Sequence, residues 1–98
     1  MRITWRDDKA RRNKQKHGLE FGLAKHVFAD PLCAILPDRV VDGEERWHAI
    51  GAVNYGLTFK ILPVVHCYPE PEDESHVCVI SLRNASPDER RRYRDRDR

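Results

Sequence analysis

Residues 46–68 read RWHAIGAVNYGLTFKILPVVHCY, and this stretch decides the fold. Its first eight residues alternate between two sets of side chains, which is the period of a β-strand. Residues 54–56, NYG, predict a turn, and a long apolar strand follows at 57–68. Pro63 interrupts this strand and removes a ladder donor, so we expect a bulge or an edge position there.

More elements lie on both sides of this hairpin. Short apolar runs predict strands at 33–36 and 76–83, and the alternation at the start predicts one at 2–5. A helix is expected from an Asp7 N-cap to His17, closed by Gly18 in the left-handed conformation. A second helix, about 20–29, carries an apolar stripe.

The clearest local signal is Ser86-Pro87-Asp88-Glu89, a capping box with proline at the first helical position. It predicts a helix from Pro87 to about Arg94. The order of elements predicts an α+β fold in which two N-terminal helices and a C-terminal helix pack on an antiparallel β-sheet.

Composition limits the possible classes. The chain has 98 residues, 40% hydrophobic and 35% charged, which is typical of a single globular domain over residues 1–98. No apolar run approaches the roughly 20 residues that span a bilayer, and the start lacks the apolar block of a signal peptide. We therefore expect a cytoplasmic protein without a membrane partner. Three cysteines without a C-x-x-C spacing favour free thiols.

Basic residues concentrate at the two ends of the chain. Of 18 lysines and arginines, seven lie in residues 1–17 and seven in residues 83–98, whereas the segment 70–74 is acidic. If the ends meet in the fold, they form one basic face suited to an RNA backbone or an acidic protein. The alternative is an ordinary solvated surface.

Five segments, in order, carry a family resemblance from Ile3 to Tyr93. They are ITWRDDKARRNKQKHGLEF (3–21), VFADP (27–31), GEERWHAIG (43–51), VVHCY (64–68) and ISLRNASPDERRRY (80–93). With this set and spacing, the chain resembles the BrnT family of bacterial toxins. The resemblance implies a RelE-like fold, a metal-independent RNA-cleaving activity that inhibits translation, and a cognate BrnA-type antitoxin. It also implies contact with promoter DNA only through that antitoxin.

Two positions depart from the family pattern. Members often carry an arginine after the tyrosine of the VVHCY segment, where this chain has Pro69, and another where it has Cys78. Such cations would stabilise a phosphorane. A second hypothesis therefore stays open, in which the chain is a catalytically weak homologue that acts mainly as an antitoxin-binding co-repressor.

Metal-free RNA cleavage needs a base, an acid and cations at the phosphate, roles that suit histidine and arginine. The catalytic candidates are His66, Arg83 and His17. Their alternative roles are a hydrogen-bonded core histidine, a salt bridge to Glu44 or Glu45, and a favourable contact with a helix C-terminus, respectively. The RNA-binding candidates are Lys9, Lys16, Arg46, Arg91 and Tyr93, although Tyr93 could instead only staple its helix to the sheet.

A zinc site is the one metal alternative. His66, Cys67, His76 and Cys78 lie on two strands joined by a short loop, but neighbouring residues on a strand point to opposite faces. Four ligands would therefore not converge easily, and no cofactor is expected.

Overall fold

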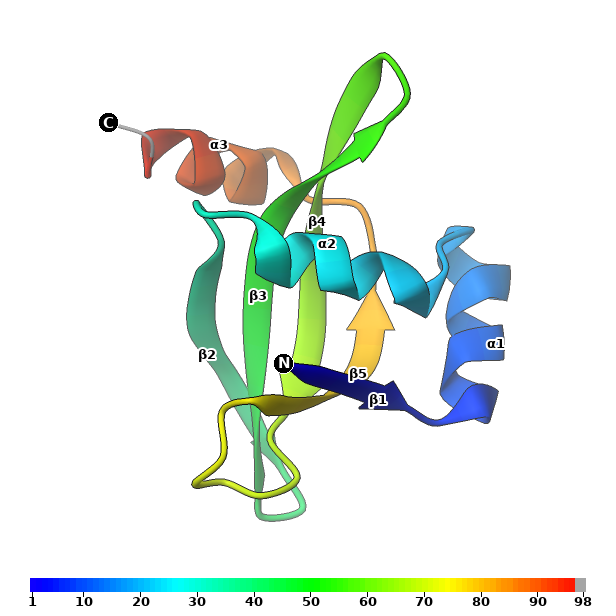
Figure 1. The fold of residues 1–98 in the computed structure, drawn as a ribbon, viewed down its shortest axis with the longest axis vertical. Coiled ribbons are helices and arrows are strands. Elements are labelled where there is room, and N and C mark those ends of the chain that lie inside the picture. Colours follow the sequence, from blue (N-terminus) through cyan, green and yellow to red (C-terminus); the bar gives the residue numbers. More distant parts are fainter. Residues whose placement is uncertain (97–98) are drawn as a thin grey trace.

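The computed structural model describes residues 1–96, without the side chain of Tyr55. Five strands form one sheet in the order β1-β5-β4-β3-β2 (Figure 1). Their bounds are β1 Arg2–Trp5, β2 Ala34–Val41, β3 Glu44–Tyr55, β4 Thr58–Cys67 and β5 His76–Leu82. β1 pairs with β5 in parallel and the other pairs are antiparallel, so the expected fully antiparallel sheet is wrong. No hairpin joins β1 to β5, and hence no turn imposes an antiparallel direction on that pair.

The helices are α1 (Asp7–His17), α2 (Ala24–Ala29) and α3 (Pro87–Asp95). The α+β prediction is confirmed, but the helix expected at 20–29 divides into a 3-10 turn, η1 (Phe21–Leu23), and α2. Asp7 is the first helical residue and Arg6 holds the N-cap position, which corrects the expected cap. The left-handed Gly18 (φ 72°) and the capping box of α3 are both confirmed.

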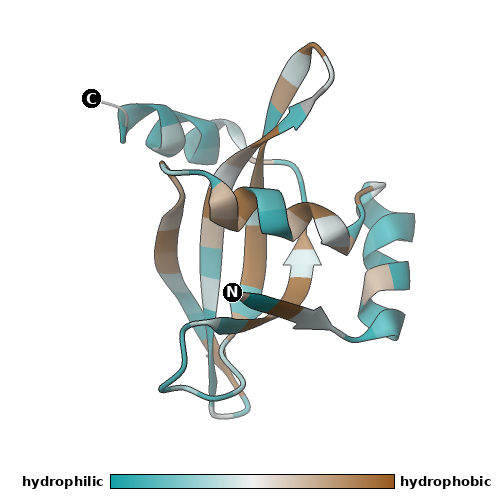
Figure 2. Ribbon diagram, in the orientation of Figure 1, coloured by the Kyte–Doolittle hydropathy of each residue, from teal (hydrophilic) through white to brown (hydrophobic). Residues whose placement is uncertain are grey.

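The two faces of the sheet carry different helices. α2 crosses the face that bears Ala49, Val53, Leu62 and Val64, and its Ala24 and Val27 are fully buried there (Figure 1). On the other face, Tyr93 of α3 packs against a smaller cluster of Ile50, Ile61 and Ala85. Figure 2 shows β4 as largely apolar and both α1 and α3 as largely hydrophilic. The alternation read from the sequence of β3 therefore separates two apolar clusters, one on each face.

Gly51 lies where α2 approaches the sheet most closely. A Cβ added there would stand 2.6 Å from the carbonyl oxygen of Val27, a contact with backbone that cannot rotate away. Only glycine permits this spacing. Its absence of a side chain thus sets how near α2 sits to β3.

We expect Gly51→Ala to lower the free energy of unfolding by about 1–3 kcal/mol, because the helix must shift to admit the methyl group. Urea unfolding followed by circular dichroism measures the change. Gly22→Ala is the matched control, since a Cβ at Gly22 meets no atom within 4 Å. Equal midpoints for the two variants would contradict the close-packing explanation.

Pro63 lies in β4, an inner strand, so the edge alternative is wrong. Its carbonyl accepts a hydrogen bond from the Arg83 N–H (3.4 Å), just beyond the end of β5. Because N–H and C=O of one strand residue point the same way, the missing donor of Pro63 faces this strand end. The register irregularity lies further on, between Val65 and His66, rather than at the proline.

That irregularity decides the direction of Arg83. Val65 pairs with Ser81 and His66 pairs with Val79, so Ile80 is an extra residue in β5. A one-residue bulge reverses the faces of all residues that follow it. Val79 and Leu82 consequently both belong to the α2-side core, and Arg83 emerges on the opposite face together with Ile80 and Ser81.

Within residues 1–96 no helix has the length and apolar character needed to cross a bilayer. The loop between β4 and β5 lies outside the core, because residues 69–75 are all exposed.

Candidate nucleic-acid interface

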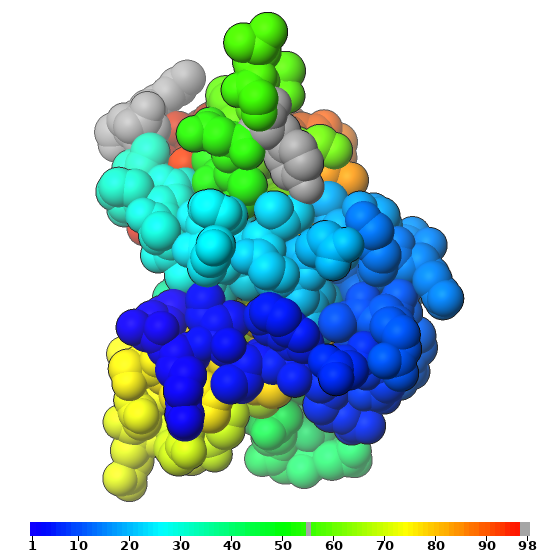
Figure 3. Space-filling model, turned by 45° about the vertical axis from the view of Figure 1, so that its right-hand side comes forward, coloured from blue at the N-terminus to red at the C-terminus, as the bar shows by residue number. Residues whose placement is uncertain are grey.

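A groove of about 460 Å³ crosses the face of the sheet opposite α2, between α1 and the strands. We call it the basic groove. It is lined by Lys9, Arg12, Asn13, Lys16 and His17 of α1, by Arg39, Arg46, Val65, Ile80 and Ser81 of the strands, and by Arg83. Within residues 1–96 this lining holds six lysines and arginines and no aspartate or glutamate. Figure 3 shows the tip of the β2–β3 hairpin next to α1, where the two walls approach each other.

Helical spacing brings the α1 residues to one side of the groove. Lys9, Arg12 and Lys16 are three and four residues apart, so their side chains lie along one face. Among the described residues, neither Lys9 nor Lys16 has an ion pair, whereas Arg12 binds Asp8 at 2.8 Å. Two of these three cations are thus available to an anionic ligand.

Asn13 holds α1 against the end of β5. Its side-chain amide donates to the carbonyls of Leu82 (2.8 Å) and Leu19 (3.2 Å), and its side-chain oxygen accepts the Leu82 N–H at 3.0 Å. The Asn13 side chain is 5% exposed. It pairs with both the N–H and the C=O of Leu82, as the backbone of a neighbouring strand would. The distance between the α1 cations and Arg83 therefore depends on this residue.

Asn13→Ala should lower the free energy of unfolding by about 2 kcal/mol, because it leaves buried backbone groups of Leu82 and Leu19 without partners. Chemical denaturation of the variant measures the loss. Gln15→Ala, an exposed change on the same helix, serves as the control and should leave the midpoint within about 0.5 kcal/mol. If both variants unfold alike, Asn13 is not the anchor described here.

Arg46 reaches the groove from β3. Its side chain is 19% exposed, and its Nε stands 3.7 Å from Glu44, too far for a hydrogen bond. That buried Nε has no hydrogen-bond partner among the described residues. Because Arg46 lines the groove, its guanidinium is suited to donating hydrogen bonds to an oxyanion bound there.

Arg83 combines the two roles that the sequence left open. Its guanidinium binds Glu89 through two hydrogen bonds of 2.7 and 2.9 Å, so the salt bridge exists, but with Glu89 instead of Glu44 or Glu45. Hydrogen bonding to Arg83 lowers the pKa of Glu89 to about 2. The same Glu89 closes the capping box of α3, and Arg83 is thereby held in place at the groove.

His17 ends α1 and lines the groove, half-buried. It is the only histidine among the groove-lining residues that the structure describes. Five of the residues that the sequence singled out therefore lie in one groove: His17, Lys9, Lys16, Arg46 and Arg83. Their chemical roles stay predictions.

His66 lies elsewhere. It belongs to the α2 face of the sheet, is fully buried, and stands edge-to-face between Phe28 and Tyr68 with ring centroids 5.1 Å from each. Burial lowers its pKa to about 4, against a weak raising effect of the Val64 carbonyl. This is the environment of a core histidine, the alternative role considered for His66 from the sequence. His66 does not line the basic groove.

Two further candidates are also outside the groove. Tyr93 donates a hydrogen bond to Asp30, which also accepts the backbone N–H groups of Leu32 and Ala52. Tyr93 therefore staples α3 to the α2–β2 connection. Arg91 is exposed on α3 and pairs with Asp88. The expectation that the first and last helices jointly form one basic face is wrong, because no residue of α3 lines the groove and its cations come from α1, the strands and Arg83.

The sequence reading missed Arg12 and Arg39. Arg12 had a usable signal, since it lies three residues after Lys9 and four before Lys16 on the same helix. Arg39 had none, because its approach to α1 follows from the shape of the β2–β3 hairpin.

The four residues considered for zinc do not come together as one set, although Cys67 and Cys78 are cross-strand partners. His76 Nδ1 lies 2.7 Å from the Glu70 carboxylate and 2.9 Å from the Arg2 guanidinium, and its Nε2 lies 2.9 Å from the Thr4 hydroxyl. Within residues 1–96 no three histidine, cysteine, aspartate or glutamate side chains are grouped as ligands.

Comparison with protein families adds an independent finding. Residues 5–89 match the model of a family described as ribonuclease toxin, BrnT, of type II toxin-antitoxin system. A comparison with curated proteins found no match. The matched range contains every residue that lines the basic groove.

Proposed function

The chain belongs to the BrnT family of ribonuclease toxins of type II toxin–antitoxin systems, and on this premise we propose that it is a metal-independent endoribonuclease that inhibits translation. The observation that carries the proposal is the basic groove, with six cations and one histidine on a shared wall and floor. RNA is a polyanion whose backbone such a surface attracts.

The groove offers one proton-transfer group and the cations that RNA cleavage without a metal uses. His17 acts as the general base on the 2′-hydroxyl or as the general acid on the leaving oxygen, a role that imidazole side chains commonly take. Arg46 and the donors of Arg83 that Glu89 leaves free hold the phosphoryl oxygens as negative charge develops on them. Lys9, Arg12, Lys16 and Arg39 bind the flanking backbone. The proposal assigns no catalytic role to His66 and no RNA contact to Arg91 or Tyr93.

The partners follow from the same family assignment. Membership in a type II system implies an antitoxin, which we propose to be of BrnA type, with promoter DNA contacted only through it. We further propose that this α+β fold is of the RelE type and that the protein acts in the cytoplasm, where its RNA substrate lies.

A second function is favoured by one observation. Cys78 lies on the same side of β5 as Ile80, a groove residue, so the arginine that relatives often carry at this position would have faced the groove. In addition, Arg83 is partly neutralised by Glu89. A weak nuclease that serves mainly as an antitoxin-binding co-repressor fits these two facts.

Purified protein without antitoxin should cleave a defined RNA, alone or with ribosomes present, and a chelator should leave the rate unchanged. Induced expression in a bacterium should stop growth and fragment cellular RNA. The absence of cleavage at any dose, ribosomes included, would replace the nuclease proposal with the co-repressor role.

A further inference from the structure

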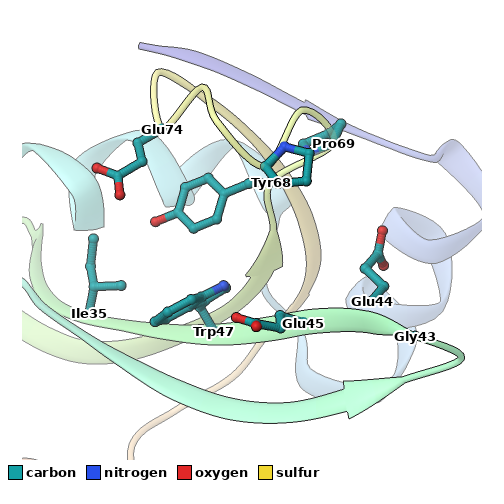
Figure 4. Close-up of a pocket in the computed structure, with 9 residues that line it drawn as sticks. Ile35, Gly43, Glu44, Glu45, Trp47, Tyr68, Pro69 and Glu74 are labelled. Carbon is teal, nitrogen blue, oxygen red and sulfur yellow. The ribbon is translucent and has the colours of Figure 1, made fainter.

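A second hollow, of about 780 Å³, opens on the α2 side of the sheet, away from the basic groove. It lies between the β2–β3 hairpin and the loop after β4, as Figure 4 shows. Trp47 and Tyr68 line it with ring centroids 6.0 Å apart and planes at 67°. His66 packs against Tyr68 at 5.1 Å, and so the aromatic wall is fixed by the core behind it.

The charges around this hollow are the reverse of those in the groove. Glu44, Glu45 and Glu74 line it, and no lysine or arginine among the residues that the structure describes does so. Glu44 faces Arg46 at 3.7 Å, whereas Glu45 and Glu74 have no ion pair within the described part of the chain. Burial and then the Glu74 carboxylate raise the pKa of the Tyr68 hydroxyl, which places that negative charge beside the ring.

Two electron-rich rings next to free carboxylates are the chemistry that recognises an organic cation. Arginine fits better than lysine, because its planar guanidinium stacks on a ring and forks onto carboxylates at once. Ile35, Pro69 and Pro71 supply apolar walls for the aliphatic part of such a side chain. The volume lies in the range of pockets that hold ligands much larger than one guanidinium, and several residues of a chain can therefore enter.

We propose that this hollow binds an arginine-bearing segment of a partner protein, with a guanidinium seated against Trp47 and Tyr68 and paired with the carboxylates of Glu45 and Glu74. The hollow and the basic groove lie on opposite faces of the sheet and adjoin where Glu44 of the hollow faces Arg46 of the groove at 3.7 Å. Identifying this partner with the antitoxin rests on the proposed function, whereas the cation chemistry of the hollow does not.

The test uses the full chain, labelled with ¹⁵N, and a blocked peptide of alternating arginine and glycine at low salt. The indole N–H of Trp47, assigned with a Trp5→Phe variant, should shift and saturate. A peptide with citrulline in place of arginine, equal in shape but uncharged, should bind at least about fivefold more weakly. Glu45→Gln and Glu74→Gln together should weaken binding about five- to tenfold, since each removes one exposed charge pair.

Glu72→Gln is the matched control, because Glu72 lies in the same loop but does not line the hollow. It should bind the arginine peptide within about twofold of the parent, since it removes an exposed charge that lies outside the lining of the hollow. The backbone amide spectrum verifies the fold of each variant. No saturable shift, equal binding of the citrulline peptide, or undiminished binding by the double variant would each overturn the proposal.

Two other occupants of the hollow, a small cation and a second copy of this chain, would each give a different result and would also overturn the proposal. Guanidinium chloride binding as tightly as the peptide would indicate a site for a small cation. Perturbation of Trp47 on dilution, with a dimer in sedimentation, would indicate a second copy of this chain. RNA plays no part in the binding assay, and the Glu45→Gln, Glu74→Gln variant should cleave RNA as the parent does. If the protein does not cleave RNA, the peptide-binding result is therefore unaffected. If the hollow does not bind the arginine peptide, the nuclease proposal is likewise unaffected.

Discussion

His17→Ala and Arg46→Ala should each slow cleavage of a defined RNA by roughly a hundredfold or more, with the fold retained. Removing one preorganised donor from a developing oxyanion costs about 2–4 kcal/mol of transition-state stabilisation. Loss of the proton-transfer group costs a similar factor. Both side chains line the basic groove and neither belongs to the apolar core, so circular dichroism should remain that of the parent.

Three comparisons sharpen this experiment. Arg46→Lys keeps the charge but loses the fork, and should recover only part of the rate. Arg83→Ala should also lower the cleavage rate by about a hundredfold, because the substitution removes a preorganised phosphate donor. Lys25→Ala controls for the loss of one positive charge, because Lys25 is exposed on α2 and does not line the groove. Its cleavage rate should stay within about twofold of the parent rate.

His66→Phe decides between the two histidines. Its rate should remain within about threefold of the parent, because the ring lies in the core on the other face of the sheet. A folded His66→Phe that loses cleavage while His17→Ala keeps it would contradict the groove as the catalytic site.

The elements that sequence predicts well here are the ones with local causes. The capping box of Ser86 and Glu89, the left-handed Gly18 and the alternation of β3 each depend on neighbours within a few residues. The gathering of Lys9 with Lys16 also follows from helical spacing alone. These signals established the α+β class and one wall of the groove.

What the sequence could not provide depends on pairing across distance. One extra residue in β5, Ile80, turns Arg83 toward the groove, and simple alternation would have placed it on the α2 face beside Val79. His66 was a candidate because its residue type suits catalysis, but its exposure is set by α2, which comes from another part of the chain. The parallel β1–β5 pair likewise has no local signature.

The burial of His66 leads to the last prediction, a loss of stability in mild acid. Burial lowers the pKa of His66 from its ordinary 6.5 to about 4. Between these values the unfolded chain binds a proton that the folded protein excludes. The stability is therefore complete above pH 6.5 and falls as the pH drops toward 4, by about 3 kcal/mol at 1.36 kcal/mol per pKa unit.

Urea unfolding at a series of pH values from 7.5 to 3 measures this dependence. His66→Phe keeps an aromatic ring against Phe28 and Tyr68 but cannot be protonated, so its stability should be nearly flat between pH 6.5 and 4.5. His26→Gln, a change at an exposed histidine of α2, should leave the parental slope unchanged. Below pH 4.5 the free energy of unfolding should fall for the parent and for both variants. Arg83 holds the pKa of Glu89 near 2, and the stabilisation from this ion pair is lost as Glu89 becomes protonated. If His66→Phe follows the parent between pH 6.5 and 4.5, the buried imidazole is not the source of the acid sensitivity, and the packing described around it is incorrect.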